Sequence, residues 1–268
     1  MPADLPPHTI VAFNTAAASE NRIHDDETAR RFGFTGALVP GVEVYAYMCH
    51  MPVSLWGREF LEHGTADCRF FKPVYDGERT TVLAERSSPH QIALRVESQG
   101  QRSAEGSASA SHGEQAPDLS AYPLVGPSAD RPPASFEALP EGRILGIAPT
   151  IIDEAALNRY LEDVRDQQSL YRAEKLVHPG QILRLCNQAL VQNVVLGPWI
   201  HVGSRVRNFS AARLGEELTL RTRIISNVET KGHAIVTCDA VAVANGSRIV
   251  SRIEHVAIWR PRQVAAAA

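Results

Sequence analysis

The chain has 268 residues and a formal net charge of −3, with 44% hydrophobic and 21% charged residues. These values are ordinary for a soluble globular protein of about two domains. The small net charge gives no electrostatic reason to expect a nucleic-acid partner, and no apolar run approaches the roughly 20 residues of a membrane span. Met1 to His8 contain no basic segment followed by an apolar one, so we expect no signal peptide and a cytoplasmic protein.

The four cysteines are widely scattered among apolar residues, at Cys49, Cys68, Cys186 and Cys238. Because no CxxC pair is present, neither a zinc site nor a disulfide framework is indicated, and we expect buried free thiols. The sequence also contains no glycine-rich phosphate loop and no constellation of metal ligands. We therefore expect neither a metal nor a cofactor.

The first part of the chain predicts one long buried helix followed by strands. Pro40-Gly41 opens an apolar stretch that runs to Gly57 and is apolar on nearly every side, as in a helix enclosed by a sheet. Pro52 should kink this helix or end it early. Residues 80–85 and 91–97 then alternate between apolar and polar side chains, as strands do.

The stretch from 113 to 146 is rich in proline and glycine. This composition forbids a continuous helix or a central strand, so we interpret it as an extended linker, partly ordered at its end near Ile144 and Leu145. It divides the chain into two units of similar size, at residues 1–112 and 147–268.

The second unit repeats the order of the first. A helix is expected over 153–172, with Asp153 as its N-cap. Pro179-Gly180 then opens a second long helix, which Gly197 should end. Alternating strands are predicted at 218–224, 236–242 and 247–259.

The two units are related by an almost constant offset in the sequence. Three pairs of landmarks are 139, 138 and 138 residues apart: Gly41 and Gly180, Arg69 and Arg207, and Gly77 and Gly215. Such an offset indicates a duplicated unit. Each unit combines one long helix with antiparallel strands, so we expect an α+β protein in which two units pair to cover both helices.

A motif in the first unit resembles that of the MaoC-like hydratases and dehydratases, which reads G-D-x-N-P-I-H-x-D followed by A, G-F-x-G and H-G-M. The residues that match it are Asn21, Ile23, His24, Asp26, Ala29, Gly33, Phe34, Gly36 and Gly41. The run from Arg69 to Val74, with Gly77, looks like the strand and turn that follow in that family. The resemblance covers about the first 110 residues, and it implies two tandem hot-dog units, a double hot-dog fold.

The resemblance also implies a reaction, the reversible addition of water to an enoyl thioester carried by CoA or a carrier protein, which makes the chain a candidate lyase. His24 would act as acid and base, because a histidine is suited to proton transfer near neutral pH. The backbone N–H groups of Gly41 and Val42 would bind the thioester carbonyl, since a helix N-terminus offers unpaired donors and a partial positive charge.

The chain departs from the family motif at its catalytic carboxylate. The family's aspartate lies five residues before the histidine, where this chain has Ser19, which cannot act as a carboxylate base. Glu20 is adjacent, but a shift of one residue usually redirects a side chain. The proline after Asn21 is replaced by Arg22, and the histidine before the helix glycine by Pro40.

Three readings follow from this departure. The chain is a hydratase or dehydratase that uses His24 with Glu20 or another carboxylate, a thioesterase that uses Glu43 in the first turn of the apolar helix, or a protein that binds a ligand without turnover. The candidate catalytic residues are His24, Glu20 and Asn21, and the candidate substrate or oxyanion residues are Gly41, Val42, Glu43 and Ser19. Two such chains could also pair as a homodimer.

Overall fold

The computed structural model describes residues 5–111 and 113–262. In this part of the chain the strands form one 11-stranded sheet, in which all neighbouring strands are antiparallel. The first unit contributes β1 (His8–Val11), β2 (Gly64–Phe70), β3 (Arg79–Ser88), β4 (Gln91–Ser98) and β5 (Gln101–Ala110). The second contributes β8 (Ile200–Asn208), β9 (Glu217–Thr230), β10 (His233–Ala244) and β11 (Arg248–Arg260), with the short strand β7 (Thr150–Ile151), and the end of the proline-rich stretch forms β6 (Ile144–Gly146). The sheet order is β1-β3-β4-β5-β2-β8-β11-β10-β9-β6, and β7 pairs with β9.

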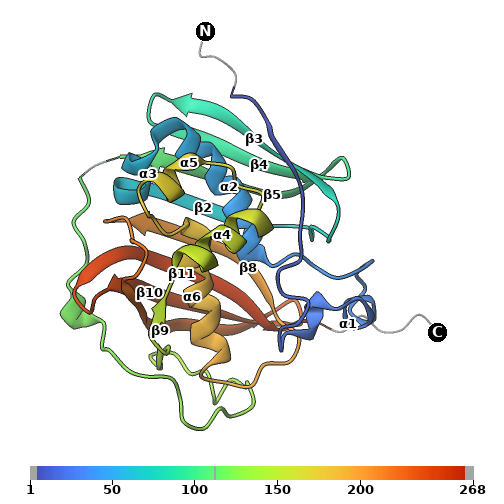
Figure 1. Ribbon diagram of the computed structural model, residues 1–268. Coiled ribbons are helices and arrows are strands. Elements are labelled where there is room, and N and C mark those ends of the chain that lie inside the picture. The colour runs from blue at the N-terminus through green and yellow to red at the C-terminus, as the bar shows by residue number, and fades with distance from the viewer. Residues whose placement is uncertain (1–4, 112, 263–268) are drawn as a thin grey trace.

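Two long helices, α2 (Gly41–Trp56) and α6 (Pro179–Val191), pack against each other and against the sheet. Figure 1 shows the strands of the first unit above and those of the second below, curving around the helices. The shorter helices are α1 (Asp26–Arg31), α3 (Arg58–His63), α4 (Glu154–Asp163) and α5 (Ser169–Ala173), with the 3₁₀ turns η1 (Arg22–His24) and η2 (Leu119–Ala121). The α+β class expected from the sequence is confirmed.

The centre of the sheet is the antiparallel pair β2 and β8, which joins the two units. Its register places Asp67 opposite Arg205, and these residues are separated by the same 138 positions that separate Arg69 from Arg207. Equivalent residues of two repeats face each other only where a two-fold axis passes between them. Gly77 and Gly215 also share a positive φ, of 76° and 81°, so the backbone agrees with the predicted duplication.

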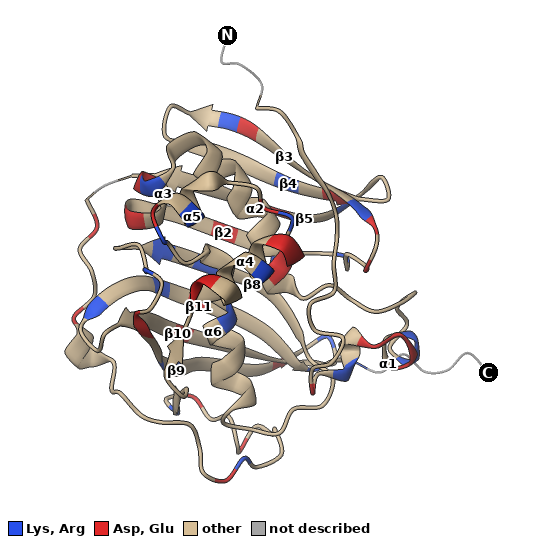
Figure 2. Cartoon of the chain, viewed as in Figure 1, with Lys and Arg blue, Asp and Glu red and all other residues tan. Residues whose placement is uncertain are grey.

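The core helices are mostly apolar because most of their residues are buried, and α6 is exposed mainly along one side, at Gln188 and in part at Arg184 and Asn187. Each carries a single charged residue, Glu43 in α2 and Arg184 in α6, and Figure 2 shows the charges gathered mostly on other elements. The four cysteines are buried free thiols, as expected. None of the described helices is long and apolar enough to cross a membrane.

Three expected elements differ in their bounds. The first long helix continues through Pro52 to Trp56 and ends at Gly57, whose φ is 53°. The helix expected over 153–172 is instead two helices, α4 and α5, separated by Arg165 at a φ of 56°. The second long helix ends at Val191, well before Gly197.

The end of the proline-rich stretch is ordered as β6, which pairs with β9. The unit boundaries at 1–112, 113–146 and 147–268 remain a prediction. Residues 1–4, 112 and 263–268, which include the outer ends of both predicted units, lie outside the described residues.

Candidate functional site

A cavity of about 630 Å³ lies between the loop that carries His24, the start of α2 and one side of α6. It brings together six of the seven candidate site residues: Ser19, Glu20, Asn21, His24, Val42 and Glu43. The seventh, Gly41, lines a small recess that adjoins the cavity at His24, Pro40, Asn187 and Trp199. The far wall is formed by α6 residues, and the proline-rich stretch covers one side with Pro127, Ser128 and Arg131. Both units therefore contribute to one cavity.

His24 is held by hydrogen bonds to both ring nitrogens. Nδ1 lies 2.7 Å from the carbonyl oxygen of Leu38. Because a carbonyl only accepts, Nδ1 carries the proton and Nε2 is the acceptor. Nε2 accepts a longer bond of 3.2 Å from Asn21 Nδ2. Burial lowers the pKa of His24 below the ordinary 6.5, and the bond to Leu38 offsets this only in part, so the ring is neutral at neutral pH.

Asn21 fixes the position of the His24 loop against the second unit. Its Nδ2 donates to the carbonyl oxygen of Trp199 at 2.9 Å, and its Oδ1 accepts from the Trp199 amide at 3.1 Å. Its Oδ1 also accepts from Ile23 N at 3.4 Å, as the N-cap of η1. These bonds set the orientation of the amide, so that Nδ2 points toward both Trp199 and His24.

Ser19 and Glu20 precede Asn21 in the loop that carries His24, and both line the cavity. Ser19 Oγ makes a long bond of 3.4 Å to the carbonyl oxygen of Asn21. The Glu20 carboxylate lies 2.8 Å from Arg131 Nη2 and its side chain is 76% exposed. Its hydrogen bond and charge interaction with Arg131 lower the pKa of Glu20, and Glu20 thereby links the loop to the proline-rich stretch.

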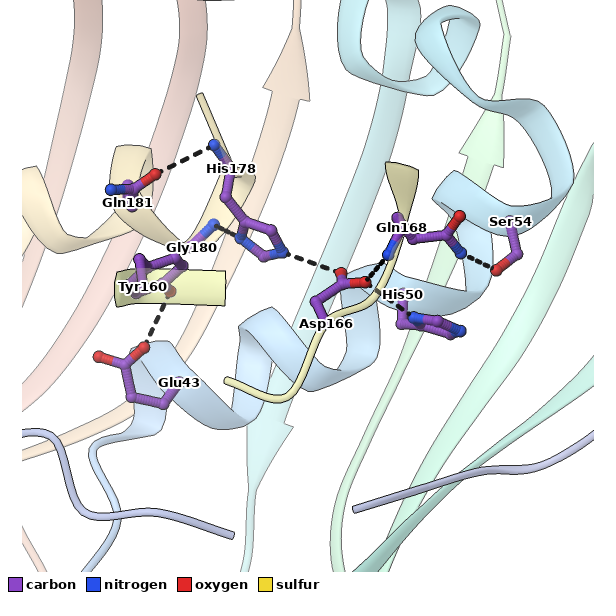
Figure 3. A network of polar contacts seen from close by, with 9 residues as sticks. All are labelled: Glu43, His50, Ser54, Tyr160, Asp166, Gln168, His178, Gly180 and Gln181. Carbon is purple, nitrogen blue, oxygen red and sulfur yellow. Dashed lines mark hydrogen bonds and ion pairs between the residues drawn. The ribbon is translucent and has the colours of Figure 1, made fainter. Parts of the chain in front are cut away.

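Glu43 is only 1% exposed, and both of its oxygens are occupied. Oε1 accepts from Thr15 Oγ1 at 3.1 Å and from the Arg184 guanidinium at 2.6 and 2.7 Å. Oε2 accepts from the Tyr160 hydroxyl at 2.8 Å, as Figure 3 shows. The Arg184 guanidinium also lies 4.4 Å from the centre of the Tyr160 ring. Glu43 is therefore an ion-paired residue that joins α2 to α4 and α6.

The starts of the two long helices differ in the capping of their amides. At α2 the N-cap is Pro40, which makes no side-chain hydrogen bond to the helix. At α6 the N-cap is His178, whose Nδ1 accepts from Gly180 N at 3.0 Å in a reciprocal capping box with Gln181 (Figure 3). The Glu43 and Val44 amides of α2 donate to the Pro40 carbonyl oxygen, but the Gly41 and Val42 amides have no hydrogen-bond partner among the described residues.

His178, the N-cap of α6, also belongs to a buried network of hydrogen bonds with Asp166 and His50. Its Nε2 donates to Asp166 at 3.2 Å, and Asp166 also contacts His50 Nδ1 at 3.1 Å (Figure 3). Although burial opposes it, these hydrogen bonds hold the pKa of Asp166 well below its usual range. None of these three residues lines the cavity, so the network joins the two units away from His24.

The second unit supplies site residues that the sequence analysis did not identify. Arg184, Asn187 and Gln188 of α6 and Trp199 before β8 line the cavity opposite His24. Of these four residues, only Arg184 could have been noticed in the sequence, because it is the one charged residue of a mostly apolar helix. Among the described residues, no group of three or more His, Cys, Asp or Glu side chains is arranged to hold a metal ion.

No protein-family model matches the chain, and no curated protein matches it in sequence. Solved structures do match along nearly the whole length. A protein of Chloroflexus aurantiacus assigned as a MaoC-domain dehydratase matches with a TM-score of 0.62 at 12% identity, over 97% of this chain and 94% of that one. A conserved hypothetical protein of Mycobacterium tuberculosis with a double hot-dog fold gives 0.60 at 14% identity, over 96% and 94%.

The matches are not limited to proteins assigned as dehydratases. A Lactobacillus plantarum protein assigned as an oleoyl thioesterase matches with a TM-score of 0.55 at 13% identity, over 97% of this chain and 98% of that one. At these identities the likeness shows the fold. The predicted double hot-dog fold is confirmed, and the resemblance to the MaoC-like proteins holds at the level of structure.

Proposed function

We propose that this double hot-dog chain is an acyl-thioester enzyme, and specifically a hydratase or dehydratase that reversibly adds water to an enoyl thioester of CoA or a carrier protein. The observation that carries the proposal is that His24 and the uncapped start of α2 face one cavity. Structural neighbours assigned as MaoC-domain dehydratases support the same reaction class.

The two parts of the site have complementary tasks in this reaction. The Gly41 and Val42 N–H groups bind the thioester carbonyl oxygen, which gains negative charge as water adds to the β-carbon. The π electrons of the double bond move toward that oxygen, and a proton of the water passes to His24 Nε2. His24 then returns a proton to the α-carbon, which restores the carbonyl and the neutral ring. His24 is neutral before the reaction, as a base must be.

The alternative of thioester hydrolysis by Glu43 has less support from the geometry. A carboxylate nucleophile or base needs a free lone pair directed at the substrate, and both Glu43 oxygens accept hydrogen bonds from Arg184, Tyr160 and Thr15. Some structural neighbours are assigned as thioesterases, so the experiment below also measures thioester hydrolysis.

The proposal is tested with crotonyl-CoA and longer trans-2-enoyl-CoA thioesters. Hydration is followed by the loss of absorbance of the conjugated thioester, and hydrolysis by release of a thiol to a disulfide dye. The wild-type chain should consume the conjugated thioester without releasing thiol. His24→Ala should lower kcat at least about 100-fold while the thermal midpoint stays nearly unchanged.

His90 provides the matched control, because it is an exposed histidine in the turn between β3 and β4. His90→Ala should keep the wild-type rate. Near-wild-type activity of His24→Ala would remove His24 from the mechanism. Thiol release by the wild-type chain would make it a thioesterase, and thioesters that raise the unfolding temperature without any turnover would make it a binding protein.

A further inference from the structure

The recess that adjoins the main cavity at His24 is bordered by three residues whose side chains carry buried polar atoms without partners among the described residues. It holds about 20 Å³ and is lined by Gly41 and Leu38 from the first unit and by Asn187, Trp199 and His201 from the second. Three buried atoms of these residues have no hydrogen-bond partner among the described residues: His201 Nδ1, Trp199 Nε1 and Asn187 Oδ1. Each such atom costs about 1–3 kcal/mol, so their grouping around one recess points to a small polar ligand group.

The protonation of His201 follows from its neighbours. Its Nε2 lies 3.0 Å from the carbonyl oxygen of Gly203 and 2.9 Å from Ser204 Oγ. The carbonyl can only accept, so Nε2 carries the proton and Nδ1 is a bare acceptor. Burial lowers the pKa of His201 to about 3, so Nδ1 remains an acceptor at neutral pH.

The residues that line the recess therefore carry both an unpartnered acceptor and an unpartnered donor. His201 Nδ1 needs a donor, whereas the indole Nε1 of Trp199 can only donate. A hydroxyl group or a water molecule donates and accepts at once, and the volume is that of about one water molecule. A carbonyl or a methyl group would leave His201 Nδ1 unpartnered.

His201 also lies close to the start of α2. A Cβ on Gly41 would lie 2.8 Å from His201 Nδ1 and 3.0 Å from the His201 carbonyl oxygen. Glycine thus lets the first turn of α2 approach this ring. The acceptor, the first amides of α2 and His24 consequently border one recess, although they come from different units of the chain.

We propose that His201 is a further catalytic residue of the second unit, whose Nδ1 accepts a hydrogen bond from the water that adds to the substrate and from the hydroxyl group of the product. This inference rests on the proposed hydration reaction. One water proton passes to His24, the oxygen bonds to the β-carbon, and the second proton remains on the oxygen, directed at His201. His201 itself gains no proton and acts by orienting the water. It would supply the second hydrogen-bond acceptor for that water, which Ser19 does not supply at the position of the family's aspartate.

The test compares three substitutions at His201. His201→Phe keeps an aromatic ring but removes both the Nδ1 acceptor and the Nε2 donor to Gly203. His201→Gln extends an amide toward the Nε2 position and leaves the Nδ1 position without an acceptor. His201→Asn places an amide oxygen near the Nδ1 position. With crotonyl-CoA we expect kcat to fall on the order of 100-fold in the first two variants, with KM changed less than about threefold. His201→Asn should recover at least about tenfold of that loss.

His255 provides the matched control. Its ring stacks on His201 at 4.3 Å between centroids, it is equally buried, and its Nε2 also has no partner among the described residues, yet it lines no part of the recess or the cavity. His255→Phe should keep kcat within about twofold of the wild type. A purely structural effect would lower the rates of both Phe variants alike.

The outcomes separate this inference from the proposed function. A wild-type chain that hydrates no enoyl thioester overturns both. A wild-type chain that hydrates crotonyl-CoA and loses activity in His24→Ala, but not in His201→Phe, overturns the role of His201 alone. Loss in His201→Phe without recovery in His201→Asn also overturns it, because the acceptor at the Nδ1 position would then not matter.

Discussion

Asn21 Nδ2 donates to His24 Nε2 at 3.2 Å, while His24 Nδ1 donates to the Leu38 carbonyl oxygen at 2.7 Å, and both Asn21 and His24 line the cavity. The shorter bond fixes the ring and its tautomer, and the longer one occupies the lone pair that the proposed reaction uses. A bond of 3.2 Å is at the long end of the normal range, so a bound water can compete for this lone pair. Asn21 is thus placed to orient the His24 ring. Its long hydrogen bond to Nε2 can break when Nε2 accepts the proton of the water.

The first prediction concerns the pH dependence of the wild-type chain. Burial lowers the pKa of His24 below 6.5, so the neutral, active form persists as the pH falls below the usual histidine value. We expect the acid limb of kcat/KM for enoyl-thioester hydration to lie below pH 6.5. The pH profile with crotonyl-CoA measures it, and an acid limb above pH 6.5 would contradict the role of a buried neutral His24.

The second prediction exchanges the amide beside His24 for a carboxylate. Asn21→Asp keeps an acceptor for the Trp199 amide but loses the donor to His24 and adds a negative charge, which favours the protonated ring. We expect the acid limb of kcat/KM to move to higher pH than in the wild type. Asn21→Ser, which is short and uncharged, controls for the lost amide, and an equal shift in both variants would exclude the charge as its cause.

The His24 loop and the α2 start could be predicted as site elements from the sequence because both are local. Asn21, His24 and Gly41 belong to one stretch that resembles the motif of the MaoC-like proteins, and an apolar run follows it. The opposite wall of the cavity and the adjoining recess are not local. Arg184, Asn187 and Trp199 reach the cavity, and His201 reaches the recess, only through the pairing of the two units along β2 and β8. The break between α4 and α5 has the same origin, since Asp166 turns to meet His178 and His50.

The third prediction concerns the ion pair of Glu43 and Arg184. Removing Arg184 leaves a carboxylate that is 1% exposed without its charge partner, and breaking a buried pair in this way costs about 3–5 kcal/mol. We expect Arg184→Met to lower the free energy of unfolding by about this amount in urea. Glu43→Gln should cost less, because the Arg184 side chain that it leaves unpaired is 34% exposed.

The double variant Glu43→Gln with Arg184→Met tests the coupling between these two residues. It should be more stable than Arg184→Met alone, since no buried charge is then left uncompensated. Additive losses in the double variant would show that the two side chains do not interact across α2 and α6.

The fourth prediction addresses Glu20, the carboxylate nearest to the position of the missing aspartate. Its side chain is 76% exposed and is directed at Arg131, so the proposed reaction does not require it. Glu20→Gln should keep at least about half of the wild-type kcat and leave the thermal unfolding midpoint nearly unchanged. A loss of activity comparable to that of His24→Ala would instead make Glu20 the second proton carrier.

The fifth prediction links the buried histidine of the recess to acid stability. Burial lowers the pKa of His201 to about 3 in the folded chain, whereas a histidine in the unfolded chain titrates near 6.5. Between these pH values the unfolded state binds a proton that the folded state does not, so this histidine makes the free energy of unfolding fall as the pH falls, by about 1.4 kcal/mol for each pH unit. His201→Phe removes this contribution and should make the decline between pH 6.5 and pH 5 shallower than in the wild type. Urea unfolding across this range measures both slopes, and equal slopes would mean that His201 is already protonated in the folded chain, which is incompatible with a bare acceptor at Nδ1.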